Sequence, residues 1–216
     1  MAAVGGGGTG KSRILERFLT GRLQNYWQYD PTILETVTTY RELPLDGDSD
    51  FQGVTLHLTD VSGQAEYSAL RSVDCYRLQH LIMICFSIDS RASLEYAQSE
   101  CMEEVRQGCH RDIPFVLVGC QSDKRGRIDT EVSVYEAHWA AMEMGAAAYF
   151  ECSAFTGDGV DDLLQGCCEI ALTWVWPERS RAALGRDEIK SRRDKKRITS
   201  RLRRGKRGWS PGCILM

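Results

Sequence analysis

Short apolar segments alternate with amphipathic ones along most of this chain. Segment 54–59 alternates apolar and polar residues, which predicts a strand with one face exposed to solvent. The continuous apolar runs 81–88 and 113–119 predict strands that are buried on both faces, and 147–152 is a weaker fourth candidate. Apolar residues recur at helical spacing in four further segments, 11–22, 91–107, 132–144 and 160–176.

Strands that alternate with helices predict an α/β fold with a mostly parallel central sheet flanked by helices. The turn-rich stretch 44–53 separates two strand candidates and predicts a long hairpin loop. Residues 1–4 are too few for a central strand of the usual length, about five or six residues. We therefore expect a truncated first strand, exposed neighbouring strands and a loosened loop after it. An upstream start codon and a divergent chain with weak ligand binding are both compatible with this pattern.

The composition fits one globular domain. The chain has 216 residues, of which 43% are hydrophobic and 26% are charged. No apolar stretch is long enough to span a bilayer, and the amino-terminal residues lack the pattern of a secretory signal. Nine cysteines without framework spacing predict buried thiols in a reducing compartment rather than disulfides or a zinc site.

The charge is divided unevenly along the chain. Residues 1–178 carry 13 Lys and Arg against 27 Asp and Glu, a net charge of −14. Residues 179–216 carry 14 against 3, a net charge of +11. We therefore expect a folded domain over 1–178 and a flexible basic tail over 179–216 that binds an anionic partner.

A glycine-rich stretch close to the amino terminus reads G-x-x-x-x-G-K-S. Glycines let backbone N–H groups point at phosphate oxygens, Lys11 supplies a positive charge to the terminal phosphates, and the Ser12 hydroxyl can ligate Mg²⁺. The stretch therefore predicts a nucleoside triphosphate site at the start of a helix, without indicating which nucleotide. Its residues are Gly5, Gly6, Gly7, Gly8, Thr9, Gly10, Lys11 and Ser12.

Two further stretches carry residues suited to a bound triphosphate. Asp60 follows a predicted strand and can hold Mg²⁺ through water, while Gly63 can donate a backbone N–H to the terminal phosphate. Gln64 can orient an attacking water molecule. Thr32, in the stretch 29–35, can supply a second Mg²⁺ ligand. These residues predict hydrolysis of the triphosphate as well as its binding.

Two more predicted strands end in polar side chains. Asp123 ends the stretch 118–123, and Ser153 lies in 151–155. Ligands of open α/β sheets bind beyond the carboxyl ends of the strands, so both residues belong to the edge where the nucleotide is expected.

Taken in this order, the motifs resemble those of the Ras superfamily of small GTPases over most of residues 4–176. The stretch 29–33 is similar to the Ras branch, whereas 84–95 and 149–163 are more similar to the Rho branch. Between Asp123 and Ser153 lie 29 residues, which is short for the extra helix that Rho proteins usually carry there. The choice between the two branches stays open.

The resemblance implies a small G domain of the P-loop NTPase class, with GTP and GDP as ligands and Mg²⁺ as cofactor. Hydrolysis is expected to be slow and to be accelerated by a GTPase-activating protein; an exchange factor and effectors are the other implied partners. Gln64 takes the catalytic role, and Ser12, Thr32 and Asp60 take the metal. The nucleotide-binding residues implied are Gly5, Gly6, Gly7, Gly8, Thr9, Gly10, Lys11, Ser12, Tyr29, Thr32, Asp60, Gly63, Gln121, Asp123, Ser153 and Ala154.

The stretch that should recognise guanine departs from the family pattern. Asp123 is retained, and its carboxylate would accept hydrogen bonds from the guanine ring N–H and amino group, a pairing that rejects adenine. The family usually has Asn or Thr, then Lys, where this chain has Cys120 and Gln121. A thiol is a poorer hydrogen-bond partner, so we expect binding to be weaker by about 0.5–1.5 kcal/mol. Tyr26 and Trp27 are the candidates for the aromatic side chain that the family stacks on the base.

The leading hypothesis is a monomeric, membrane-anchored GTP hydrolase that acts as a signalling switch. The alternative is a non-catalytic membrane adaptor with a degraded GTPase fold, which Cys120, Gln121 and the short first strand favour. A P-loop ATPase or kinase is disfavoured by Asp123 and by the order of the motifs.

The chain ends in C-I-L-M, a prenylation box in which Cys213 is the acceptor for a prenyltransferase. Terminal Met is typical of farnesyl without excluding geranylgeranyl. One lipid chain anchors only marginally, but residues 190–208 hold 11 Lys and Arg against one acid and can bind anionic membrane lipids. We expect the protein to be located at the cytoplasmic face of the plasma membrane or of endomembranes. Nuclear localisation and nucleic-acid binding are the rival functions, and we do not expect nucleic acid because no aromatic residue precedes Trp209 in the tail's basic run.

Overall fold

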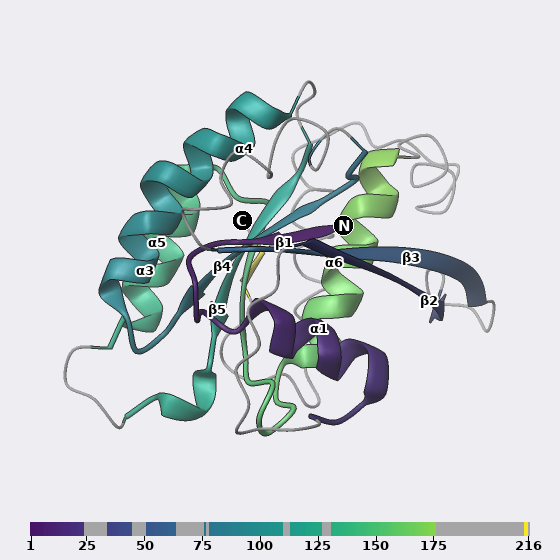
Figure 1. Ribbon diagram of the computed structural model, residues 1–216, viewed down its shortest axis with the longest axis horizontal. Helices are drawn as coiled ribbons and strands as arrows, with labels where there is room; N and C mark the ends of the chain where they lie inside the picture. The colour runs from purple at the N-terminus through teal and green to yellow at the C-terminus, as the bar shows by residue number, and fades with distance from the viewer. Residues whose placement is uncertain are drawn as a thin grey trace, which may run out of the picture.

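The computed structural model describes residues 1–23, 34–44, 51–63, 76, 78–109, 113–126, 131–175 and 214–215. Helices lie on both sides of one sheet (Figure 1). No helix in these parts of the chain is long and apolar enough to cross a membrane. In chain order the elements are β1 (Ala2–Val4), α1 (Lys11–Thr20), β2 (Leu34–Pro44), β3 (Phe51–Val61), β4 (Ile82–Ser87), α3 (Arg91–Tyr96), η2 (Ala97–Cys101), α4 (Met102–Gly108), β5 (Phe115–Cys120), η3 (Ser122–Lys124), α5 (Val134–Met144), β6 (Ala148–Cys152), α6 (Val160–Val175) and β7 (Ile214–Leu215).

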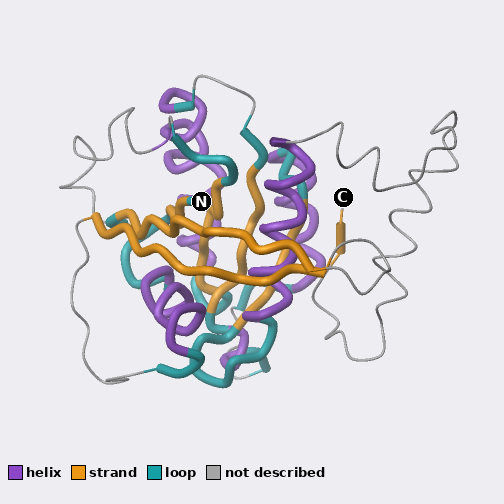
Figure 2. Tube along the Cα trace, turned by 90° about the vertical axis from the view of Figure 1, so that its right-hand side faces the viewer, coloured by secondary structure: helices purple, strands orange, loops and turns teal. Residues whose placement is uncertain are grey.

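The sheet has the strand order β2-β3-β1-β4-β5-β6-β7 within the described residues. β1 pairs in parallel with both β3 and β4, and the parallel pairing continues through β5 and β6. β2 pairs antiparallel with β3, which confirms the predicted hairpin, but Pro44 and residues 51–53 of the predicted loop 44–53 belong to the paired strands. β7 adds a short antiparallel strand to β6 at the other edge of the sheet (Figure 2). The mostly parallel α/β fold predicted from the sequence is confirmed.

The predicted strands and helices all occur, with small shifts at their ends. In β3, Leu56 and Leu58 are buried while Thr55 and His57 are exposed, which confirms the predicted alternation. β4 and β5 are buried along their whole length, as continuous apolar runs require. The segment predicted as one helix over 91–107 is instead interrupted by a π-helical turn at η2.

β1 is only three residues long, as the short amino-terminal segment predicts. The expected exposure of its neighbours was wrong, because Thr59 and Ile82 beside it are buried. Backbone hydrogen bonds hold the short strand on both sides: the N–H of Ala2 donates to Leu81 at 3.1 Å, and that of Thr59 donates to Met1 at 2.9 Å. A cavity of about 600 Å³ opens beside Met1, and its lining includes Leu56, His57, His80, Cys168, Leu172 and Val175.

Two hydrophobic clusters form the core, one on each side of the sheet. Successive residues of β4 point to opposite sides, so that Met83 belongs to the cluster with α1 and α6. Ile82 and Ile84 belong to the cluster with α3, α4 and α5 (Figure 1). Of the cysteines described, six are buried and Cys109 is half-buried, and all are free thiols, as predicted. This packing fixes the carboxyl ends of the parallel strands at one common edge.

Candidate nucleotide-binding site

A tight loop joins β1 to α1 and shapes an anion-binding site. Gly5 adopts a φ of 136°, and a Cβ there would lie 2.1 Å from the carbonyl oxygen of Cys85, so no larger residue fits. The first turn of α1 holds no acidic residue, and its N-cap, Gly10, has no side chain to satisfy the helix N–H groups. The positive end of α1 therefore faces the loop, an arrangement that binds phosphate.

The Lys11 side chain is buried inside this loop. Its Nζ donates hydrogen bonds to the carbonyl oxygens of Gly5 at 2.9 Å and Gly6 at 2.7 Å, and it lies 3.4 Å from the Thr9 hydroxyl. Burial lowers the pKa of Lys11 below its ordinary value, while the nearby Cys85 and Asp60 oppose that shift. The ammonium is therefore already placed where phosphate oxygens would meet the loop.

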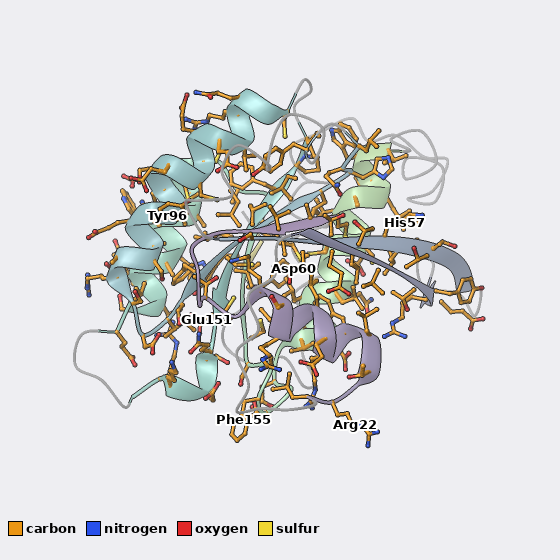
Figure 3. The ribbon with its side chains drawn as sticks, in the orientation of Figure 1. Arg22, His57, Asp60, Tyr96, Glu151 and Phe155 are labelled. Carbon is orange, nitrogen blue, oxygen red and sulfur yellow. The ribbon has the colours of Figure 1, made fainter. Side chains whose placement is uncertain are left out.

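The end of β3 lies directly against the phosphate loop. Asp60 is buried there, close enough to Lys11 for its charge to act on the lysine pKa. In Figure 3 it lies between β1 and α1. A Cβ on Gly63 would lie 2.4 Å from the carbonyl oxygen of Gly5, so the backbone at Gly63 touches the loop. Ser12 is exposed in the first turn of α1. Carboxylate, hydroxyl and phosphate-binding N–H groups thus share one region.

A second loop, after β5, is bonded to the phosphate loop. Gln121 adopts a φ of 63°, the only positive φ of a non-glycine residue in the described part of the chain. Its Nε2 donates to the carbonyl oxygens of Gly8 at 3.1 Å and Thr9 at 3.3 Å. The neutral amide therefore joins the two loops. The thiol of Cys120 is buried and turned back to the Val118 carbonyl at 3.8 Å.

Asp123 and Ser153 meet at the same edge. Asp123 lies in η3, and the Ser153 hydroxyl donates to its Oδ1 at 2.5 Å. Ser153 is fully buried, and its own N–H donates to the Asp158 carbonyl at 2.9 Å. Ala154, the next residue, is also buried. The Asp123 carboxylate is thus held in one orientation, as a hydrogen-bond acceptor for a base must be.

An ion pair that the sequence did not predict joins the loop after β5 to strand β6. Arg125 Nε donates to Glu151 Oε2 at 2.7 Å, and a second guanidinium nitrogen contacts Oε1 of the same carboxylate. The Tyr149 hydroxyl donates to Glu151 Oε1 at 2.6 Å. Glu151 is labelled in Figure 3. Their positions in the sequence could have indicated this pair, because Arg125 lies two residues after Asp123 and Glu151 lies two residues before Ser153.

The structure brings most of the predicted site residues together at the carboxyl edge of the sheet. Their chemical roles remain predictions. Tyr26, Trp27, Tyr29, Thr32, Gln64 and Cys213 lie outside the described residues. The residues that converge are Gly5, Gly6, Gly7, Gly8, Thr9, Gly10, Lys11, Ser12, Asp60, Gly63, Gln121, Asp123, Ser153 and Ala154.

Together the fold and the site define a small G domain of the P-loop nucleotide-binding class. Comparison with known proteins agrees: the family model described as "Ras family" matches residues 1–172. The chain therefore belongs to the Ras family, and its enzyme class is that of the small GTPases, which hydrolyse GTP.

Similar curated proteins carry Rho names. "GTP-binding protein rho2" of Schizosaccharomyces pombe is 36% identical over 183 residues, covering 80% of this chain and 86% of that protein. "GTP-binding protein RHO2" of Saccharomyces cerevisiae is 35% identical, covering 76% of this chain and 84% of that protein. "GTP-binding protein RHO1" of Candida albicans is 34% identical, with coverages of 80% and 87%. These similarities favour the Rho-like branch, which the sequence left undecided.

Proposed function

We propose that this chain is a Rho-like switch that binds GTP and GDP with Mg²⁺, hydrolyses GTP slowly and acts at a membrane. The convergence of Lys11, Asp60 and Asp123 at one edge of the sheet carries this proposal. A cation suits the phosphates, and the carboxylate of Asp60 suits a metal ion. The second carboxylate, that of Asp123, pairs with the two N–H donors of guanine. Adenine lacks those two donors in that arrangement, so the site favours guanine.

The oxygen donors present fit a magnesium ion. The Asp60 carboxylate and the Ser12 hydroxyl are hard oxygen ligands, which Mg²⁺ prefers, and it is commonly bound by one or two carboxylates, waters and substrate phosphates. No cluster of three or more His, Cys, Asp or Glu side chains suited to a metal occurs among the described residues, and such an ion needs none. When bound, the ion would neutralise developing charge on the phosphates. Thr32 is the further ligand that we propose.

The contact between Gly63 and the phosphate loop supports a switch. A terminal phosphate on this loop would meet the backbone N–H of Gly63 and, through Thr32, the segment 29–36. Binding of GTP would then order both 29–36 and 61–72, whereas GDP would leave them unrestrained. Effectors would recognise the ordered shape, and an exchange factor and a GTPase-activating protein would set its lifetime.

Membrane anchoring rests on the chemistry of the tail. A prenyltransferase would modify Cys213, and the Lys and Arg residues of 190–208 would bind anionic lipids on the cytoplasmic face of the plasma membrane. A Cys213→Ser variant should move from the membrane to the soluble fraction of cells at physiological salt. Continued membrane association of this variant would rule out the lipid anchor.

A nucleotide-binding experiment tests the central proposal. The full chain should bind a fluorescent GTP analogue in the presence of Mg²⁺, and GTP and GDP should displace it while ATP should not. Chromatography of the denatured, purified protein should release GDP or GTP. Absence of both binding at micromolar protein and co-purified nucleotide would disprove the proposal.

The non-catalytic adaptor remains a second candidate because of one observation. Cys120 stands where the family has Asn or Thr, and its thiol is turned back into the strand. In that case the chain would reach the membrane but would show no single-turnover hydrolysis of GTP. Measurable hydrolysis that depends on Mg²⁺ would exclude the adaptor.

A further inference from the structure

Three large apolar side chains are exposed in a row on α5. Tyr135, Trp139 and Met142 are 77%, 51% and 58% exposed. They are spaced by four and three residues, so they share one side of the helix. The rings of Tyr135 and Trp139 are nearly parallel, with centroids 6.5 Å apart. We call this surface the α5 face. Apolar side chains gathered in this way commonly mark an interaction site.

The charges around the α5 face are acidic. Segment 131–144 contains three glutamates and neither Lys nor Arg, and of these Glu131 is paired with Arg125 from outside the segment. Glu143 is exposed beside Met142, while Glu136 is paired with Arg91. The adjacent segment 91–108 adds four glutamates against two arginines. An acidic surface repels an anionic membrane and favours a basic, partly apolar partner.

The tail of this chain has the complementary chemistry. Residues 190–208 contain seven Arg and four Lys. Arginine stacks its planar guanidinium on exposed Trp and Tyr rings, and it pairs with carboxylates. Ile198 and Leu202 add apolar side chains within the same run. The tail therefore matches the α5 face in both charge and stacking partners.

The carboxyl-terminal end of the tail is placed on the strand beside α5, whereas α6, which precedes the tail, lies on the other side of the sheet. The tail leaves the G domain after Val175, the last residue of α6. At its far end, Ile214 and Leu215 form β7 and pair with Tyr149 and Ala148 of β6 (Figure 2).

α5 packs on that same strand. The ring of His138, on α5, lies 4.7 Å from the ring of Tyr149. Ile214 lies eight positions after Lys206, and this length of chain can span roughly 26 Å when extended. This reach exceeds the length of α5, which is about 16 Å. Because α5 and β7 both contact β6, this length of chain lets the basic run approach the α5 face while Ile214 stays paired with β6.

We propose that the α5 face binds this chain's own basic tail, residues 190–209, and withholds it from anionic membranes until lipids compete. This contact goes beyond the proposed function, which gives the tail only a membrane partner. It does not depend on bound nucleotide.

Cross-linking of the unlipidated full chain tests the contact directly. A zero-length carbodiimide should join Glu136 or Glu143 to Lys195, Lys196 or Lys206, as identified by mass spectrometry. The yield should not change on tenfold dilution, because the contact lies within one chain. A yield that falls on dilution would assign the tail to a second copy, and the absence of these cross-links would place it elsewhere. Either result overturns the proposal.

A vesicle-binding assay tests the consequence. Release of the tail by Trp139→Gln or Glu143→Lys should raise partitioning onto phosphatidylserine-containing vesicles about twofold to fivefold, the effect of one lost cation–π or charge contact. The control is Glu169→Lys, which makes the same charge change on an exposed residue of α6, across the sheet. Trp139→Gln adds no charge, so it separates docking from general electrostatics. The docking is refuted if Glu143→Lys partitions onto the vesicles no more than Glu169→Lys does, and Trp139→Gln no more than the unchanged chain does.

Discussion

The hydroxyl of Ser153 donates a hydrogen bond of 2.5 Å to the carboxylate of Asp123. The two lie 30 positions apart in the chain, and they are joined because β5 and β6 are adjacent and parallel. In the role that we propose for Asp123, its carboxylate would face both N–H donors of a guanine base without having to be reoriented on binding.

Replacing Ser153 by alanine should loosen that orientation. We expect Ser153→Ala to weaken GTP binding by about threefold to tenfold, the value of one neutral hydrogen bond. The preference for GTP over inosine triphosphate should shrink, because the inosine base lacks the amino group that a fixed carboxylate accepts from. Titrations with both nucleotides measure the ratio of the two affinities. An unchanged ratio would mean that Ser153 does not orient Asp123.

Gln121 should act by holding the two nucleotide loops together. Its amide bonds two carbonyl oxygens of the phosphate loop, so Gln121→Ala should speed GDP dissociation by about threefold to tenfold or more. Gln121→Lys is the matched control, because a lysine can reach the same carbonyls and also carries charge. It should dissociate no faster than the unchanged chain in stopped-flow displacement. Equal rates for all three chains would contradict the bridging role.

The Arg125–Glu151 pair should matter for stability. The Glu151 side chain is only 9% exposed, so Arg125→Met leaves a nearly buried carboxylate without its cation and should lower the free energy of unfolding by ~3 kcal/mol. The double variant Arg125→Met/Glu151→Leu should recover much of this loss. Urea denaturation provides the measurement.

An exposed pair serves as the control for that experiment. Arg91 and Glu136 are 52% and 32% exposed, so Arg91→Met should cost under ~1 kcal/mol. Similar losses of unfolding free energy in Arg125→Met and Arg91→Met would show that burial of the Arg125 pair does not increase its contribution to stability.

Alkaline pH should destabilise the fold through its buried thiols. Burial, with a smaller effect of Glu169, raises the pKa of Cys168 from 9.0 to about 11. The pKa of Cys168 is higher in the folded chain than in the unfolded one. The contribution of the protonated thiol to the free energy of unfolding is therefore fully present below pH 9, and it is lost as the pH rises towards 11. It amounts to about 2–3 kcal/mol. Between pH 8.5 and 10.5, Cys168→Ala should lose less unfolding free energy than the unchanged chain, and parallel pH profiles would refute the prediction.

Gln64, which lies outside the described residues, should affect hydrolysis but not binding. Gln64→Leu removes the amide that would orient the attacking water, so turnover stimulated by a GTPase-activating protein should fall at least a hundredfold, on the order seen for general positioning groups. GTP affinity should be unchanged in the same preparation. Single-turnover rates equal to those of the unchanged chain would remove Gln64 from the mechanism.

The apolar pattern was sufficient to predict the sheet and its coverage. β4 and β5 are buried on both faces and therefore read as continuous apolar runs, and β3 alternates because one face is open. The π-helical turn at η2 was not predictable, because a single widened turn leaves the spacing of apolar residues almost unchanged. The burial of Thr59 and Ile82 beside β1 was also missed. It depends on backbone hydrogen bonds, which a pattern of side chains does not reveal.

The site was predicted where backbone shape and residue type coincide. Gly5 and Lys11 are close in sequence, so their geometry follows from a local motif. The contacts of Gln121 and Arg125 join segments that are far apart, and only the strand order brings them together. The substitution of Gln for Lys therefore read as a loss from the sequence, whereas the structure shows the Gln121 amide bonded to two carbonyl oxygens of the phosphate loop.

The ammonium of Lys11, bonded to carbonyls of its own loop, has a consequence for nucleotide exchange. An incoming phosphate competes with those carbonyls for the three N–H donors of the ammonium, so each donor that it takes from a carbonyl offsets part of the enthalpy gained. In return the same side chain holds two carbonyl oxygens of the loop when no phosphate is present, and the loop can keep its curvature between the departure of one nucleotide and the arrival of the next.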